Sequence, residues 1–233
     1  MITFKNVYKE YPNGVQALMD INIEIPRGDF VFFVGPSGAG KSTMIKLLIR
    51  EEKTTRGNIF IDDKDITKLM DFQVPKLRRK VAVVFQDYRL LPKKTVWENV
   101  AYALEITGES RRVIRQRVPY VLDLVGLQDK DKSYPSELSG GEGQRLSIAR
   151  AMVSNPSVLL CDEPTGNLDS ETAMTVMEAL KRVNEEGATI LMASHARDIV
   201  NRMKKRVVTL EKGRIISDVQ GGSYYEVHKA DSE

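Results

Sequence analysis

The chain contains one glycine-rich stretch with a lysine near its end, Gly35-Pro36-Ser37-Gly38-Ala39-Gly40-Lys41-Ser42-Thr43, which fits the pattern G-x-x-x-x-G-K-[ST]. An apolar run at residues 30–34 precedes it and predicts a buried strand, because a half-exposed strand would alternate polar and apolar residues. Residues 44–48 then place apolar side chains at helical spacing. A strand, a glycine loop and a helix in this order are the context in which the pattern binds phosphate.

Each residue type in this stretch suits a nucleotide. Glycines let the backbone turn tightly, so that successive N–H groups point inward at phosphate oxygens. The following helix adds the positive end of its dipole. Lys41 would reach the β- and γ-phosphates, and the hydroxyl of Ser42 would be a ligand for Mg²⁺. The alternative is a plain glycine-rich turn, which the flanking strand and helix disfavour. The stretch therefore predicts a nucleotide site.

Composition limits the classes of protein to which this chain of 233 residues can belong. A hydrophobic content of 42%, a charged content of 29% and a net charge of +3 do not indicate a nucleic-acid-binding protein. No apolar run approaches the ~18 residues of a membrane span, and residues 1–5 open no signal peptide. We therefore expect a cytoplasmic protein that reaches a membrane only through a partner. The single cysteine, Cys161, excludes an internal disulfide and is expected to be a small buried side chain.

Apolar patterns along the chain predict an α/β fold with an open sheet. Ile21, Ile23 and Ile25 alternate with polar residues, so the first thirty residues are predicted to form antiparallel strands with one wet face. We expect the apolar run at 81–85 to be a central parallel strand. Further strands are expected at residues 57–62, 158–161, 189–193 and 207–210.

A helical segment interrupts the strands between residues 88 and 155. Apolar positions from Ile114 to Val125 fall on one helical face, and Pro119 among them predicts a kink or a new helix start. The prediction is one domain over residues 1–233. Its parts are a core with an antiparallel β subdomain (1–87 and 156–220), a helical subdomain (88–155) and a loose tail (221–233).

Four predicted strands end at residues suited to a ligand site, namely Gly35, Gln86, Asp162 and His195. Open α/β sheets collect ligands at the carboxyl ends of their strands. Asp162 beside Glu163 would be a costly buried pair without a cation. We therefore expect Asp162 to hold Mg²⁺ and Glu163 to polarise an attacking water, the alternative being a helix N-cap pair.

The residue types of Gln86 and His195 alone leave two roles open for each. Gln86 is either a surface residue or a group that senses the metal ion and the attacking water. His195 is either a structural histidine or a donor to the γ-phosphate. Tyr11 lies in a predicted turn at 11–14, where it is either an ordinary turn aromatic or a ring on which adenine stacks.

A second glycine turn, Leu138-Ser139-Gly140-Gly141-Glu142-Gly143-Gln144-Arg145, precedes another helical pattern. Ser-Gly-Gly at a helix start is an anion site by the same physics as the first. One nucleotide does not need two such sites from one chain. Two chains arranged head to tail would each supply one half, whereas the alternative is a turn that merely begins a helix.

These motifs together resemble those of the ABC-type ATPases, a P-loop NTPase family. GPSGAGKST, Gln86, LSGGEGQR, LLCDEP, Asn167-Leu168-Asp169 and His195 look like its Walker A, Q-loop, signature, Walker B, D-loop and H-loop, in the family's order. The match runs from Ile2 to about Ile216.

The resemblance implies Mg²⁺-dependent ATP hydrolysis by a homodimer that sandwiches two ATP molecules. Ser139, Gly140, Gly141 and Glu142 of one chain would face the γ-phosphate held by Lys41 of the other. Tyr11 matches the aromatic that stacks on adenine, Glu163 and His195 match catalytic residues, and Ser42, Gln86 and Asp162 match the residues around the metal. The chain departs from the family at Gly143, which usually is a long polar residue, and a glycine there costs the helix up to ~1 kcal/mol.

Three further stretches, Gln73-Val74-Pro75-Lys76-Leu77-Arg78-Arg79, FQDYRLLPKKTVWENVAYA and DEPTGNLD, resemble the branch of the family that acts in bacterial cell division. This likeness implies an integral membrane partner through which ATP turnover controls peptidoglycan hydrolases. The alternative is the ATPase subunit of a lipoprotein-exporting or small-molecule transporter, whose ATPase motifs would be the same. A DNA-repair ATPase of the family would carry long coiled-coil arms, and a P-loop kinase would have no reason to carry LSGGEGQR.

The segment that follows Gln86 is unusually apolar and aromatic for a loop. We predict that it forms a docking groove for a cytoplasmic helix of the membrane partner, lined by Tyr88, Leu90, Leu91 and Trp97. The alternative is that these side chains bury themselves in the helical insert.

Overall fold

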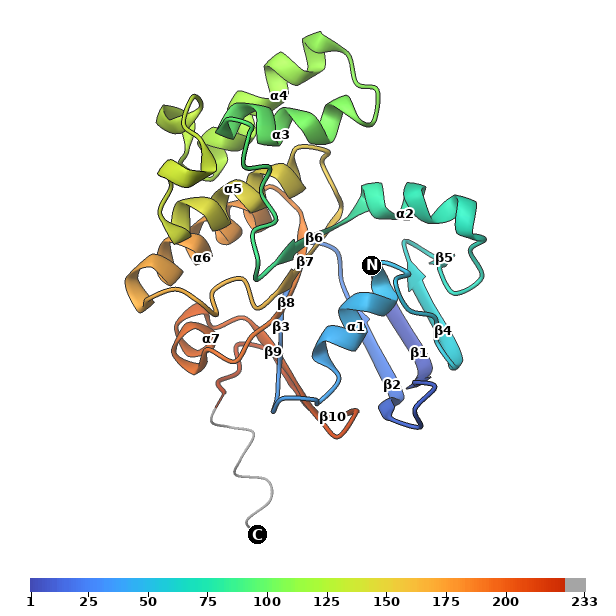
Figure 1. The fold of residues 1–233 in the computed structure, drawn as a ribbon. Helices are drawn as coiled ribbons and strands as arrows, with labels where there is room; N and C mark the ends of the chain where they lie inside the picture. Colours follow the sequence, from blue (N-terminus) through green and yellow to red (C-terminus); the bar gives the residue numbers. More distant parts are fainter. Residues whose placement is uncertain (225–233) are drawn as a thin grey trace.

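A computed structural model describes residues 1–224, and Figure 1 shows two β-sheets with helices packed around them. The larger sheet has six strands. In spatial order they are β10 (Arg214–Val219), β9 (Arg206–Glu211), β3 (Phe30–Val34), β8 (Thr189–Ala193), β7 (Val158–Asp162) and β6 (Val81–Phe85). The smaller sheet consists of β2 (Gln16–Ile25), β1 (Ile2–Glu10), β4 (Arg56–Ile61) and β5 (Lys64–Asp65).

Strand β3 shows why the larger sheet is built from continuous apolar runs. It pairs in parallel with β8 on one side and β9 on the other, and all five of its side chains are buried. Phe30 and Phe32 pack into a core with α3–α7, whereas Val31 and Phe33 pack into a second core with α1 and the smaller sheet. A strand covered on both faces has no solvent-exposed face, so the predicted buried strand is confirmed.

Helices cover both faces of the larger sheet. The α-helices of the described residues are α1 (Lys41–Leu48), α2 (Val74–Lys80), α3 (Val96–Glu105), α4 (Arg111–Leu124), α5 (Gly140–Met152), α6 (Ser170–Glu185) and α7 (Arg197–Met203). Short 3₁₀ turns are η1 (Asp71–Gln73), η2 (Gln128–Lys130) and η3 (Pro135–Glu137). Helices α3, α4 and α5 form the helical insert, drawn in green to yellow in Figure 1. Within residues 1–224, no helix has both the length and the apolar character needed to cross a bilayer.

The smaller sheet has the predicted antiparallel pairing, since β1 pairs antiparallel with both β2 and β4. Ile21, Ile23 and Ile25 of β2 are buried, and the polar residues between them are exposed. Cys161 on β7 is also fully buried, as expected, and burial raises the pKa of its thiol.

Two expectations about local structure are corrected. Strand β6 is parallel, but it pairs only with β7 and so lies at the edge of the described sheet, not in its centre. Its apolar run has another cause, because α5 and α2 both contact it and its side chains enter both cores. Of the two alternatives for Pro119, a kink or a new helix start, the structure excludes the second, because α4 continues through it to Leu124.

The start of the predicted loose tail is also corrected. Tyr224 belongs to the described structure, and its backbone N–H donates to Asn201 Oδ1 at 2.7 Å. The guanidinium of Arg197 lies 5.0 Å from the centre of the Tyr224 ring. The chain is therefore held as far as Tyr224, and residues 225–233 of the predicted tail lie outside the described residues.

Asn99 on α3 fixes the segment that joins β6 to the insert. Its side chain is fully buried, and its Oδ1 accepts from the backbone N–H of Leu91 at 2.8 Å. Its Nδ2 donates to the backbone oxygens of Leu91, Lys94 and Thr95 at 2.9–3.1 Å. The sequence reasoning missed this residue, although a single polar residue on an apolar helical face was a signal for it.

Replacing Asn99 by alanine should destabilise the protein, because the Leu91 N–H would lose its partner in a buried place. We expect Asn99→Ala to lower the free energy of unfolding by about 2 kcal/mol, measured by chemical denaturation. Glu105→Ala, an exposed change on the same helix, should alter it by less than about 0.5 kcal/mol. Equal losses in the two variants would contradict the role of Asn99.

Candidate nucleotide site

The carboxyl ends of four parallel strands meet at one edge of the larger sheet. Strands β3, β8, β7 and β6 are consecutive neighbours there, and Gly35, His195, Asp162 and Gln86 stand at or directly after their ends. The strand pattern predicted this gathering, and the structure confirms it.

The glycine loop after β3 needs glycine at two of its positions. Gly35 and Gly40 have φ values of 139° and 108°, in the region that side chains other than glycine rarely adopt. A Cβ on Gly35 would overlap the backbone oxygen of Leu210, and one on Gly40 would lie 2.7 Å from that of Ala17. Helix α1 begins directly after this loop without a side-chain cap. The N–H groups of its first turn are therefore free for an anion.

Lys41, the first residue of α1, is buried under the loop. Its Nζ donates to the backbone oxygens of Gly35 at 2.8 Å and Pro36 at 3.0 Å. Burial lowers the pKa of Lys41, and the charges of Glu163 and Asp162 oppose that shift. The loop thus holds one cation close to two carboxylates, where phosphate oxygens would compete for it.

Ser42 and Asp162 form a donor pair that fits Mg²⁺. The hydroxyl of Ser42 donates to Asp162 Oδ1 at 3.1 Å, so two oxygen ligands lie within reach of one ion. No group of three or more His, Cys, Asp or Glu side chains suited to a metal ion occurs in residues 1–224. Mg²⁺ at a nucleotide needs none, because it takes one or two protein oxygens and completes its shell with phosphates and water.

Gln86 approaches the same edge from β6. Its Nε2 donates to Asn167 Oδ1 at 3.1 Å, which leaves Oε1 as the atom that it can offer to a cation. A Cβ on Gly166 would lie 2.9 Å from that Nε2, so Gln86 also packs closely against the loop after β7.

Glu163 and His195 form a direct pair, with His195 Nε2 and Glu163 Oε1 2.9 Å apart. Both side chains are partly exposed, at 30% for Glu163 and 40% for His195. The backbone of Glu163 is left-handed, with φ at 51°, and its N–H donates to the backbone oxygen of Ala193. Such a conformation costs a non-glycine residue of the order of 1 kcal/mol, so the fold fixes this carboxylate against a local preference.

Tyr11 lies beside the glycine loop. Its hydroxyl is 3.4 Å from Thr43 Oγ1, and Lys9 Nζ lies 4.8 Å from the centre of its ring. The ring is therefore fixed next to the helix that carries Lys41, and its stacking on the base of a bound nucleotide stays a prediction.

The second glycine turn forms the start of α5. Ser139 Oγ accepts from the Glu142 N–H at 3.3 Å, and Glu142 Oε2 accepts from the Ser139 N–H at 2.8 Å, which is a capping box. This hydrogen bond and the nearby Lys130 lower the pKa of Glu142. Ser139 and Gly140 are exposed, and within residues 1–224 no hydrogen bond joins Ser139, Gly140 or Gly141 to the first glycine loop.

Asp169 has a structural role in this chain. Its Oδ1 accepts from the backbone N–H groups of Glu171 at 3.1 Å and Thr172 at 2.9 Å, so it caps α6. The hydrogen bonds to Thr172 lower the pKa of Asp169.

The four predicted docking residues have different surroundings. Leu90 and Trp97 pack against the core that contains the insert, which is the alternative that the sequence left open for them. Tyr88 lies against Gly143 of α5. Leu91 is half-buried, and its backbone is held by Asn99.

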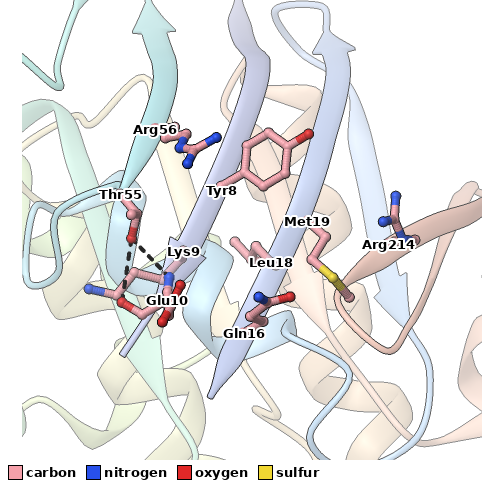
Figure 2. Close-up of a pocket in the computed structure, with 9 residues that line it drawn as sticks. All are labelled: Tyr8, Lys9, Glu10, Gln16, Leu18, Met19, Thr55, Arg56 and Arg214. Atoms are coloured by element: carbon pink, nitrogen blue, oxygen red, sulfur yellow. Dashed lines mark hydrogen bonds between the residues drawn. The ribbon is translucent and has the colours of Figure 1, made fainter. Parts of the chain in front are cut away.

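A separate hollow of about 240 Å³ crosses the smaller sheet and β10. Figure 2 shows Arg56 beside Tyr8 in it, with Met19 between Tyr8 and Arg214. It contains none of the predicted nucleotide residues, so the strand-end site is built without it.

Comparisons with known proteins agree with the motifs. A family model described as ABC transporter matches residues 18–166. The chain is 55% identical over 224 residues to the Bacillus subtilis "Cell division ATP-binding protein FtsE", covering 96% of this chain and 98% of that one. It is 52% identical over 224 residues to the protein of the same name from Streptococcus pneumoniae, covering 96% and 97%.

A solved structure has the same fold. It is a dimeric ATP-binding cassette in a post-hydrolysis state, bound to ADP and Pi, with a TM-score of 0.83 and 35% identity over 96% of this chain and all of that one. The predicted P-loop NTPase fold is therefore confirmed, as is the resemblance drawn from the motifs. The chain belongs to the ABC transporter family and is one of the family's ATPase subunits.

Proposed function

We propose that two copies of this chain bind two Mg·ATP head to tail and that their ATP turnover drives an FtsX-like membrane subunit, which regulates peptidoglycan hydrolysis in cell division. The observation that carries the proposal is the single sheet edge at which Lys41, the Ser42–Asp162 pair and the Glu163–His195 pair lie together. The relatives named for cell division support the biological role.

The residues at this edge divide the chemistry among them. Ser42 and Asp162, with Gln86 beside them, would hold Mg²⁺, which neutralises phosphate charge when bound. Lys41 and the N–H groups of α1 bind the phosphates. Glu163 is the general base that accepts a proton from the attacking water, and His195 Nε2 orients that carboxylate.

The head-to-tail dimer explains the two anion sites of one chain. Ser139 and Gly140 are exposed at the start of α5 and are not bonded to the loop around Lys41. Facing a second copy, they would complete its nucleotide site. The dimeric cassette with ADP and Pi supports this arrangement, because that protein is 35% identical to this chain.

The membrane subunit would hold the chain at the inner face of the membrane. The segment after Gln86 leads from the nucleotide edge into α3, so a movement of Gln86 would reach whatever docks on this segment. Leu91 and Tyr88 are the two predicted docking residues that are half-buried and not part of the insert core, and the Tyr88 ring packs on Gly143 of α5, so Leu91 is the one chosen for a test. An exporting transporter would use the same ATPase residues, but the names of the relatives favour division.

Glu163→Gln should retain ATP binding and lose hydrolysis, because an amide is a poor proton acceptor. We expect kcat to fall by about a hundredfold or more, with an unchanged Kd for ATP. Phosphate release and nucleotide titration measure the two quantities. Lys41→Ala is the matched control, since it should weaken binding itself. Normal turnover by Glu163→Gln would remove Glu163 from its role.

Two inactive variants should restore activity when they are mixed. Ser139→Arg places a bulky side chain at the start of α5 (the signature turn, Ser139–Gly143), and Lys41→Ala removes the lysine that binds the phosphates. Each homodimer is therefore expected to be inactive. Their heterodimer has one intact site, with Lys41 from one chain and Ser139 from the other. In an equimolar mixture about half of the dimers are heterodimers with one working site of two, so phosphate release should reappear at up to about a quarter of the wild-type rate. Hydrolysis by a strictly monomeric protein would disprove the head-to-tail site.

Leu91→Glu should abolish co-purification with the membrane subunit, because it places a charge in an apolar contact, and should leave the Kd for ATP unchanged. Ile106→Glu is the matched control. Ile106 is 66% exposed at the end of α3, outside the docking segment, so this change should retain the partner. Loss of the partner in both variants, or in neither, would place the docking site elsewhere.

A further inference from the structure

The ring of Tyr88 occupies the space that side chains would fill on two residues of α5. A Cβ on Gly143 would lie 3.0 Å and 3.1 Å from two ring carbons of Tyr88. A Cβ on Gly140 would lie 2.9 Å from the Tyr88 hydroxyl oxygen. The ring therefore spans one full turn of the helix, and burial of this tyrosine raises its pKa. Glycine at both positions is what lets the ring come so close.

The backbone that carries Tyr88 is tied to the same helix. Arg150 of α5 donates from Nη2 to the backbone oxygen of Tyr88 at 2.9 Å and from Nη1 to that of Arg89 at 2.6 Å. Gln144, fully buried in α5, donates from Nε2 to the backbone oxygen of Phe85 at 3.2 Å. Backbone and ring contacts together fasten the segment 85–89 along α5.

The opposite side of the first turn of α5 is closed as well. A Cβ on Gly141 would overlap the Thr172 side chain of α6, and one on Gly140 would lie 3.2 Å from Leu168. The turn is thus clamped between Tyr88 and the start of α6. This packing explains Gly143, a departure from the family pattern, because a long side chain there would push against the Tyr88 ring.

We propose that Tyr88 is a positioning residue for the composite ATP site: its ring holds Ser139–Gly143 in the orientation that meets the nucleotide of the other subunit. The inference rests on the proposed head-to-tail dimer. Tyr88 then supports the site whose Lys41 belongs to the other chain. An effect through Gln86, two residues away, would instead act on the nucleotide held by its own chain.

The mixed dimer separates these two routes. In the mixture described above, the Lys41→Ala chain supplies the working signature turn and the Ser139→Arg chain supplies the working phosphate loop. Adding Tyr88→Ala to the first chain should lower kcat by about tenfold. Adding it to the second should change kcat by less than about twofold, with KM for ATP unchanged in both. The reverse order, or equal losses, would overturn the proposal.

Hydrogen exchange of the single chain provides a test that needs no activity. Tyr88→Ala should speed exchange of the amides in residues 140–144 by at least about threefold, while Tyr88→Phe, which keeps the ring, should leave them unchanged. Unchanged exchange in Tyr88→Ala would overturn the proposal. If the mixture of Lys41→Ala and Ser139→Arg without a Tyr88 change is inactive, the proposed head-to-tail site is wrong. Hydrogen exchange then still shows whether Tyr88 holds the first turn of α5.

A swap tests the steric argument directly. Gly143→Gln should displace the ring and lower wild-type turnover by about tenfold, by the same misplacement of the turn. Combining it with Tyr88→Ala removes the clash, so the double variant should be no slower than Tyr88→Ala alone. Losses that multiply in the double variant would show that the two residues act independently, against the proposal.

Discussion

Parallel pairing of β3, β8, β7 and β6 is the constraint on which the nucleotide site depends. These strands come from regions of the chain that are far apart, yet the sheet aligns their carboxyl ends at one edge. Burial on both faces sets this pairing, because β3, β7 and β8 carry few polar side chains that could turn toward water. Gly35, Asp162 and His195 become neighbours through that packing alone.

Burial also sets the chemistry at this edge. Lys41 lies under its loop with a lowered pKa, and the carboxylates of Asp162 and Glu163 keep its ammonium form favourable. Bound phosphates would add negative charge to the same place and strengthen that form further. The left-handed backbone of Glu163 is tolerated because the neighbouring strand β8 accepts its N–H. The loop, the lysine and the base are thus held by one set of strand ends.

The sequence was sufficient where a local pattern has one physical cause. Continuous apolar runs predicted the buried strands, and the glycine pattern predicted the loop that bends at Gly35 and Gly40. Pairing order is different, because an apolar run shows that a strand is covered and not which strands flank it. The run at 81–85 was therefore assigned to the centre of the sheet, whereas helices α5 and α2 pack on β6 at its edge.

Contacts between side chains that are distant in the sequence could not be predicted, because a local pattern does not show which residues meet in the fold. The position of Asn99 on an apolar helical face signalled a buried polar contact but did not identify Leu91 as its partner, and Gly143 alone suggested only a weakened helix. The structure gives that glycine a partner, Tyr88, which is distant in the sequence but adjacent in space. A departure from a family pattern is thus best judged together with the side chain that fills its space.

The segment 85–89 links the strand-end edge of the larger sheet to the first turn of α5. Gln86 stands at the edge proposed to hold the chain's own nucleotide, while Phe85 and Tyr88 are fastened to α5, whose first turn would face the nucleotide of the other subunit. A displacement of Gln86 would therefore act on both, because the backbone on either side of it is hydrogen-bonded to α5. In the proposed head-to-tail dimer this geometry would couple each site to the other through the segment 85–89.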